Sequence, residues 1–232
     1  MAVDSFAHFG RATVEGAFAH RLLRRSTFRR HVSIANEERL RATLAEGKGA
    51  ILVTGHLGVW ELFGRVFQFL GGRSHVVYRP PKNPFADRFL REWRAALGQE
   101  LVEREGALRP LLRALRDGGY IGLLMDQHAK RDGVWTPFFG RSASTTPAPA
   151  LLALRTGAPI LPGYLRRLPG TYRFELFFDE PLRVAPSGDR AADIERVTAR
   201  LSSLLESYIR RTPTQWLWMH RRWRTPPHDA LN

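Results

Sequence analysis

The sequence has no cysteine, which excludes disulfide bonds, cysteine-ligated zinc and a thiol nucleophile. It also has no run of about 18 consecutive apolar residues, so no transmembrane span is expected. The first thirty residues contain six arginines and no apolar stretch long enough for the core of a signal peptide. These absences predict a cytoplasmic protein, either free or bound to the cytoplasmic face of a membrane.

Lysine is scarce, because Lys48, Lys82 and Lys130 are the only three, yet the formal net charge is +14. Nearly all of the positive charge is therefore arginine, whose planar guanidinium favours phosphate and carboxylate groups. The charge indicates a phosphorylated, acidic or membrane-surface partner. A GC-rich genome that encodes arginine in place of lysine would explain the residue choice equally well.

Short apolar runs alternate with helical patterns along the chain. Five strands are predicted, at residues 50–56, 75–79, 120–126, 158–167 and 172–180. Helices are predicted at 37–46, 57–70, 83–97, 108–117 and 146–157, followed by a last helix over 194–208. This alternation predicts an α/β fold with a mixed, largely parallel central sheet that is flanked by helices.

The segment 1–36 is expected to be helical and amphipathic, and residues 37–232 to form the main domain. Apolar residues recur at near-helical spacing in this segment, at Phe6, Phe9, Val14, Phe18 and Leu22. A basic amphipathic helix can lie in a membrane interface, and an apolar stripe can equally pack on its own domain. Both alternatives stay open.

The stretch GHLGVWEL, residues 55–62, follows the apolar run AILVT and places His56 five positions before Glu61. On a regular helix that spacing leaves two side chains about 140° apart. The pair can meet only if His56 stands off the helix, at the turn from strand to helix, where Gly55 and Gly58 allow unusual backbone angles. A carboxylate on one imidazole nitrogen would then make the other a general base for an alcohol. A purely structural histidine is the alternative.

Four blocks of the chain, in this order, resemble one family. GHLGVWEL is similar to the HxxxxD/E motif of the lysophospholipid acyltransferase superfamily, in the glutamate variant of the bacterial lipid A late acyltransferases of the lauroyl and myristoyl type. The other blocks are VYRPPKNP at 77–84, the stretch from LLMDQHAK to APILP at 123–162, and PTQWLWMHRRWRTPP at 213–227. The resemblance covers about residues 37–227.

This resemblance implies the sandwich fold of the glycerolipid acyltransferases and an O-acyltransferase activity. The donor would be an acyl thioester, on acyl carrier protein or CoA, and the acceptor a hydroxyl of a lipid A precursor, glycolipid or lysophospholipid at the inner face of the cytoplasmic membrane. By the same similarity His56 is the base and Glu61 its partner, while Arg79 and Asp126 belong to the site. No metal and no bound cofactor are implied, and nucleic acid is not an expected partner.

Residue chemistry adds to these assignments. Arg79 and Asp126 each end a predicted strand at the same edge as His56, where an α/β sheet binds its ligands. A surface arginine and a structural salt bridge are their alternatives. Gln127 lies next to Asp126 and is a weaker candidate for substrate binding. Thr146 begins a predicted helix, whose first N–H groups can hold a phosphate or an oxyanion.

Two aromatic stretches have several interpretations. Phe138 and Phe139 suit either an acyl channel or the core. The stretch QWLWMHRRWR, residues 215–224, suits a membrane headgroup zone, stacking on single-stranded nucleic acid, or tryptophans packed under the sheet.

The sequence departs from the family's pattern in two ways. It has no hydrophobic anchor before the domain, so peripheral membrane binding or a soluble side branch is expected. Val59 stands where the family often has asparagine, which leaves the acceptor open. A basic nucleic-acid-binding protein, an esterase and a lipid-binding relative are the alternatives in function.

Overall fold

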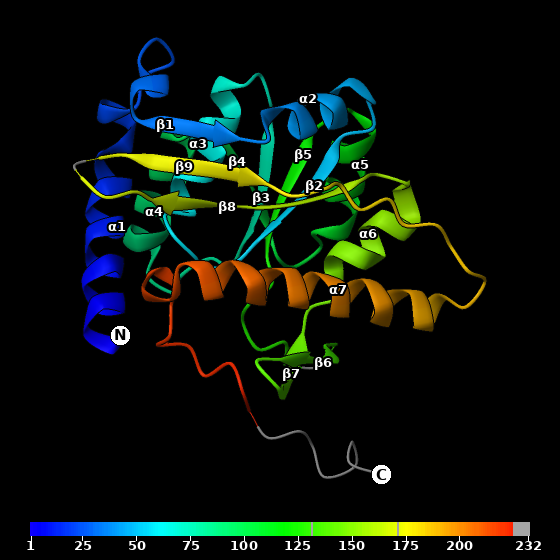
Figure 1. The fold of residues 1–232 in the computed structure, drawn as a ribbon. Helices are drawn as coiled ribbons and strands as arrows, with labels where there is room; N and C mark the ends of the chain where they lie inside the picture. The colour runs from blue at the N-terminus through cyan, green and yellow to red at the C-terminus, as the bar shows by residue number, and fades with distance from the viewer. Residues whose placement is uncertain (131, 171, 225–232) are drawn as a thin grey trace.

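The computed structural model describes residues 1–130, 132–170 and 172–224 (Figure 1). Its centre is a seven-stranded sheet in the order β1-β9-β8-β2-β5-β3-β4. Of its strand pairs, only β8 with β9 is antiparallel. The strands are β1 (Val32–Ala35), β2 (Ala50–Thr54), β3 (Ser74–Tyr78), β4 (Gln99–Glu103), β5 (Tyr120–Leu124), β8 (Ile160–Arg167) and β9 (Phe174–Phe178). The predicted α/β class with a mixed, largely parallel sheet is confirmed.

Helices cover both faces of this sheet. They are α1 (Ala2–Leu22), α2 (Glu37–Ala45), α3 (Glu61–Phe69), α4 (Pro84–Ala96), α5 (Leu108–Arg116), α6 (Ala148–Thr156) and α7 (Arg190–Arg211). Residues of α1, α2 and α3 share one buried cluster with the sheet, and residues of α5, α6 and α7 share the other. The result is a three-layer sandwich. None of the helices in the described residues has the length and apolar composition that crossing a bilayer requires.

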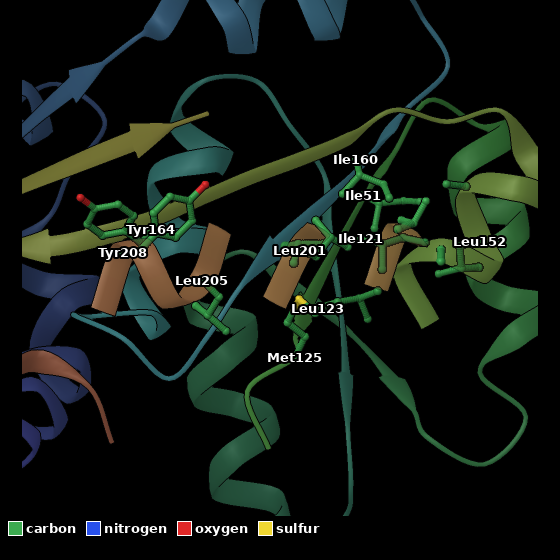
Figure 2. Close-up of a cluster of buried hydrophobic side chains, with 14 of the residues drawn as sticks. Ile51, Ile121, Leu123, Met125, Leu152, Ile160, Tyr164, Leu201, Leu205 and Tyr208 are labelled. Atoms are coloured by element: carbon green, nitrogen blue, oxygen red, sulfur yellow. The ribbon is translucent and has the colours of Figure 1, made fainter. Parts of the chain in front are cut away.

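The alternating apolar side chains of β2 explain both layers. All five residues of β2 are buried, with Ile51 and Val53 facing α5, α6 and α7 and Leu52 facing the α1 side. Figure 2 shows Ile51 and Ile121 of the neighbouring strands against Leu201 of α7. A strand buried on both faces is apolar along its whole length, which is the pattern that predicted it.

Four strands were not predicted. β1 and β4 are the two edge strands of the sheet, and each pairs in parallel with its one neighbour, β1 with β9 and β4 with β3. β6 (Val134–Phe138) and β7 (Arg141–Thr145) form a separate antiparallel hairpin. The β4 sequence QELVE and the β7 sequence RSAST contain too few apolar residues to register as strands. Edge and hairpin strands need less burial, so their sequences give a weaker signal.

The division into segment 1–36 and domain 37–232 stays a prediction, and residues 225–232 lie outside the described residues. The structure shows that β1, from the first segment, pairs with β9 of the main sheet through Val32 opposite Phe174. Helix α1 also packs on the domain, with Ala12, Ala19 and Leu23 fully or almost fully buried. The 1–36 segment is thus built into the same core.

Candidate active site

His56 lies in the turn between β2 and α3, off the helix, as its spacing predicted. The turn brings it to the carboxyl end of a central parallel strand, beside the carboxyl end of β5. Gly55 makes the approach possible, because a Cβ atom on it would come within 3.1 Å of the Asp126 carboxylate and 2.9 Å of a Leu205 methyl group. The imidazole keeps 17 % of its side-chain surface exposed, so a substrate can reach it.

The carboxylate that orients His56 belongs to Asp126. His56 Nδ1–H donates to Asp126 Oδ1 at 2.7 Å, and the His56 backbone N–H donates to Asp126 Oδ2 at 2.7 Å. An ionised carboxylate only accepts, so this contact fixes the proton on Nδ1 and leaves the Nε2 lone pair free. Asp126 follows β5 by two residues and its side chain is only 3 % exposed. The bond therefore lies in a water-poor setting where it strengthens the base.

The charges around this pair shift both pKa values. Burial by itself lowers the pKa of His56, but the charge and hydrogen bond of Asp126, with help from Glu61, outweigh it and leave the pKa raised. Burial likewise pushes the pKa of Asp126 up, and His56 together with Trp216 brings it below its ordinary value. Asp126 is therefore a carboxylate at neutral pH, and His56 in its neutral form can take a proton at Nε2.

Glu61, the partner expected from the motif, is placed differently. It is the first residue of α3, and its Oε1 accepts a hydrogen bond from Arg94 of α4 at 2.9 Å. Its position at a helix N-terminus is favourable for a carboxylate. Among the described hydrogen bonds, the one from His56 Nδ1 goes to Asp126 and not to Glu61. Glu61 acts on His56 through charge alone, and its catalytic role stays a prediction.

The Gln127 side chain lies next to the His56 imidazole. Its Nε2 is 3.4 Å from His56 Nε2, at the nitrogen that would take the acceptor's proton. The Gln127 side chain is exposed, so a substrate hydroxyl can displace it. Its role in substrate binding stays a prediction.

Arg79 lies at the same edge of the sheet as His56, and Thr146 lies between β7 and α6. Arg79 follows β3, which is separated from β2 by β5, and its side chain is exposed. The helix predicted to begin at Thr146 begins at Ala148, and Thr146 Oγ1 accepts the Ala148 N–H at 3.4 Å. Whether either residue binds substrate stays a prediction.

The tryptophan-rich segment completes the site, a role that the sequence did not single out. Trp216 is 2 % exposed and its Nε1–H donates to Asp126 Oδ2 at 2.8 Å. The Leu217 N–H donates to the His56 carbonyl at 3.0 Å. Among the interpretations of this segment, the structure supports tryptophans that pack in the protein, because Trp216 also contacts Phe138 and Phe139. The sequence showed that this segment is rich in tryptophan, but it did not show that Trp216 would bind Asp126.

His220 was also missed. Its Nε2 accepts the backbone N–H of His128 at 3.0 Å, so the segment that follows α7 holds the loop after β5. Burial, together with the positive charges of His56, Arg224 and Arg222, lowers the pKa of His220 against the opposing charge of Asp126. Arg222 itself is buried and donates to the Ser144 carbonyl and to Thr145 Oγ1 in β7. One short segment thus connects the loop after β5 with the β6–β7 hairpin.

Helix α1 reaches the site from the other side. Ser5 Oγ donates to the Trp216 carbonyl at 2.6 Å, and His8 Nε2 donates to the Gly58 carbonyl at 3.0 Å. The Phe9 ring stacks on Trp60, whose own ring lies edge-on to His56 with centroids 5.1 Å apart. Three neighbouring residues of α1 therefore contact groups that surround the imidazole.

The part of the chain that the structure describes contains no cluster of three or more histidine, aspartate or glutamate side chains that could hold a metal ion.

The chain is also similar in sequence to proteins of known function. The sequence profile described as "Bacterial lipid A biosynthesis acyltransferase" matches residues 1–225. The chain belongs to this family. It is 29 % identical over 204 residues to the lipid A biosynthesis lauroyltransferase of Escherichia coli (strain K12), an alignment that covers 87 % of this chain and 64 % of that protein.

The chain is also similar to two further acyltransferases. The chain is 30 % identical over 195 residues to the phosphatidylinositol mannoside acyltransferase of Mycobacterium tuberculosis (strain CDC 1551 / Oshkosh), covering 82 % of this chain and 59 % of that protein. It is 27 % identical over 229 residues to the lipid A biosynthesis palmitoleoyltransferase of E. coli (strain K12), covering 98 % and 72 %. The chain thus spans about three fifths of the length of the first two relatives. Residue 131 and residues 225–227 of the family-like blocks lie outside the described residues.

Proposed function

We propose that this protein is an O-acyltransferase that moves a fatty acyl group from a thioester, on acyl carrier protein or CoA, to a hydroxyl of a membrane lipid. The observation that carries the proposal is the 2.7 Å bond from His56 Nδ1 to Asp126 Oδ1, which directs the Nδ1 proton to the carboxylate and presents Nε2 of the neutral imidazole on a side chain that is 17 % exposed. The named relatives act in lipid A biosynthesis or on phosphatidylinositol mannoside, so a glycolipid acceptor is favoured over a lysophospholipid.

The reaction follows from the position of the two nitrogens. His56 Nε2 takes the proton of the acceptor hydroxyl while the oxygen of that hydroxyl attacks the thioester carbonyl carbon. The tetrahedral intermediate collapses as the carbon–sulfur bond breaks, and the imidazolium returns its proton to the leaving thiolate. Asp126 stays ionised and stabilises the imidazolium. The products are the acylated lipid and the free thiol of the carrier.

The hydroxyl that attacks belongs to the acceptor in this proposal. There is no cysteine in the chain, and the buried Ser144 hydroxyl donates to the Ala129 carbonyl at 2.7 Å. Direct transfer therefore needs no acyl-enzyme. Arg79, Gln127 and the Thr146 hydroxyl are the proposed donors to the oxyanion, because each carries an N–H or O–H group that can donate to it.

The electrostatic character of the surface fits an acidic donor and an anionic acceptor. A net charge of +14 steers an acidic carrier protein toward the enzyme. We propose that the protein binds peripherally to the cytoplasmic face of the inner membrane.

The test is incubation with a labelled acyl carrier protein thioester and acyl-CoA against a panel of lipid A precursor, phosphatidylinositol mannoside and lysophospholipid acceptors. His56→Ala should reduce transfer by about 10²-fold or more. His75→Ala is the matched control, because His75 Nδ1 also faces a carboxylate, Glu100 Oε2 at 3.3 Å. Equal loss in both variants, or no loss in His56→Ala, would contradict the proposal.

The same geometry accepts water in place of the lipid hydroxyl, which would make the enzyme an esterase or thioesterase. Product analysis separates the two activities. Labelled acyl lipid supports transfer, whereas labelled free fatty acid formed at the same rate with and without acceptor supports hydrolysis.

A further inference from the structure

The two faces of helix α1 differ sharply. Its inner face carries Ser5, His8 and Phe9, which contact Trp216, Gly58 and Trp60 next to His56. Further along the same face, Glu15 forms an ion pair with Arg167 of β8, and the Gly16 carbonyl accepts the Trp93 indole N–H at 3.0 Å. Figure 1 shows α1 along one side of the molecule. This face is fully engaged with the domain.

The outer face of α1 is apolar and exposed. At about 100° per residue its large apolar side chains occupy an arc of about 160°, opposite the inner face. They are Val3 (80 % exposed), Phe6 (58 %), Val14 (58 %), Phe18 (48 %) and Leu22 (47 %). Five large apolar side chains on one exposed helix face mark an interaction site.

The charged residues near this outer face indicate which partner binds to it. Residues 1–30 contain six arginines and two acidic residues, Asp4 and Glu15, and Glu15 is turned inward to Arg167. Arg11 and Arg21 of α1 are exposed, as are Arg24 and Arg25 directly after it. At about 100° per residue Arg11 and Arg21 fall within the same arc as the apolar side chains. A face on which apolar side chains alternate with arginine matches the boundary between anionic headgroups and acyl chains. A second copy of this chain would place these arginines near one another and is disfavoured.

We infer that the outer face of α1 binds an anionic lipid bilayer and that the same helix transmits this binding to His56. The inference rests on the proposed function, because it supplies the surface on which the lipid acceptor is presented. Phe9 stacks on Trp60 and Trp60 borders His56, while Ser5 holds the segment that contains Trp216. Binding of the outer face to lipid favours the folded, docked state of α1 and thereby the arrangement of the site.

Four variants of the full chain separate the surface from the coupling. Phe6→Ser with Phe18→Ser removes apolar contact from the outer face, and Arg11→Gln with Arg21→Gln removes two charges. Arg116→Gln with Arg155→Gln is the matched control, because these exposed arginines border a hollow beside Lys48, at the amino end of β2 and far from His56. Phe9→Ala removes the inner contact to Trp60 alone.

Binding is measured first, by co-sedimentation with phosphatidylcholine vesicles with and without phosphatidylglycerol and with no acyl donor present. Wild type should bind the anionic vesicles at least about 10-fold more tightly than neutral ones, with affinity falling as salt rises. The two outer-face variants should lose most of this binding, whereas the control pair and Phe9→Ala should retain it. Equal binding by the outer-face variants would overturn the inference, whatever the enzymatic activity.

Turnover is measured next, with a dispersed short-chain acceptor and with acceptor in vesicles. The outer-face variants should match wild type on dispersed acceptor and lose the stimulation by vesicles, while Phe9→Ala should be slower in both assays. Unchanged turnover in Phe9→Ala would overturn the coupling. Light scattering in the absence of lipid gives one more outcome: a dimer that Phe6→Ser with Phe18→Ser dissociates would assign the face to a second copy and overturn the lipid assignment.

Discussion

His56 Nδ1 and Asp126 Oδ1 lie 2.7 Å apart although 70 positions separate them in the chain. The two residues meet because each follows a parallel strand by two positions, and those strands, β2 and β5, are neighbours in register, with Thr54 opposite Leu124. The histidine and its carboxylate thus come from two different blocks of the sequence. The His56–Asp126 pair depends on which strands are neighbours in the sheet, and the spacing of residues within one motif does not reveal it.

Asp126→Asn should therefore impair catalysis more than Glu61→Gln. An asparagine amide can donate to Nδ1 and reverse the tautomer, so we expect kcat to fall by about 10²- to 10⁴-fold. Glu61→Gln leaves the bond to Asp126 intact and weakens the contact with Arg94, so its loss should be smaller. Single-turnover acyl transfer by both variants tests the order. A larger loss in Glu61→Gln would show that the motif glutamate, and not Asp126, is the essential carboxylate.

The pH profile should show a base whose pKa is raised. The neutral imidazole is the active form, so kcat/KM should rise with unit slope and level off above a midpoint higher than 6.5, the ordinary value for histidine. In Glu61→Gln one favourable negative charge is lost, so the midpoint should move to lower pH. Initial rates between pH 5 and 9 measure both midpoints. A wild-type midpoint below 6.5 would contradict the charge arrangement around His56.

The sequence predicted the central fold well because buried parallel strands are apolar throughout. AILVT at 50–54 and YIGLL at 120–124 are β2 and β5. The Asn83 cap, whose side chain accepts the Phe85 N–H at 2.9 Å, marked the start of α4 correctly, whereas the helix expected from Thr146 begins at Ala148. Strands β1, β4, β6 and β7 escaped because they lie at edges or in a hairpin, where little burial is required.

The sequence predicted which edge of the sheet carries His56, Asp126 and Gln127, and it did not predict how their side chains pair. His56, Asp126 and Gln127 do come together, but Asp126 and not Glu61 holds the imidazole. Hydrogen bonds between distant segments depend on strand order, which composition and spacing do not contain. For α1 the expected apolar stripe exists, yet most of it faces outward, because small residues such as Ala12 and Ala19 allow the opposite face to pack closely.

Trp216→Phe should weaken the hold on Asp126 while keeping an aromatic ring in the core. The lost indole N–H bond to a carboxylate is worth about 1.5–3 kcal/mol. Asp126 has a lowered pKa, so its contribution to stability is present above the unfolded value near 3.9 and is lost as pH falls through the lower folded value. Without Trp216 the folded pKa rises, and acid unfolding followed by circular dichroism should begin at higher pH. Trp218→Phe, whose indole bonds only the Pro213 carbonyl, should not move it.

Gly58→Ala should destabilise the turn that carries His56. Gly58 has φ of 64°, and a Cβ atom there would lie 1.9 Å from the Leu165 carbonyl oxygen, so the backbone must move. We expect a loss of about 3 kcal/mol or more in the free energy of unfolding, together with reduced turnover. Gly71→Ala is the control for strain alone, because its φ is 92° and no atom lies within 4 Å; that variant should lose only about 1–2 kcal/mol. Equal destabilisation in urea titrations would show that the contact with β8 is unimportant.

His220 should prove to be a positioning residue for the loop that carries Asp126 and Gln127. Its Nε2 accepts the His128 N–H, so the ring must be neutral with its proton on Nδ1, which agrees with its lowered pKa. His220→Leu leaves that N–H without its partner and should lower kcat by about 10-fold through displacement of the loop. His220→Gln restores an acceptor at a similar reach and should recover most of the activity, whereas a general loss of packing would affect both variants alike. Nitrogen-15 NMR of the imidazoles supplies an independent signature: His220 should show an unprotonated Nε2 at neutral pH, and finding the proton on Nε2 would refute this role.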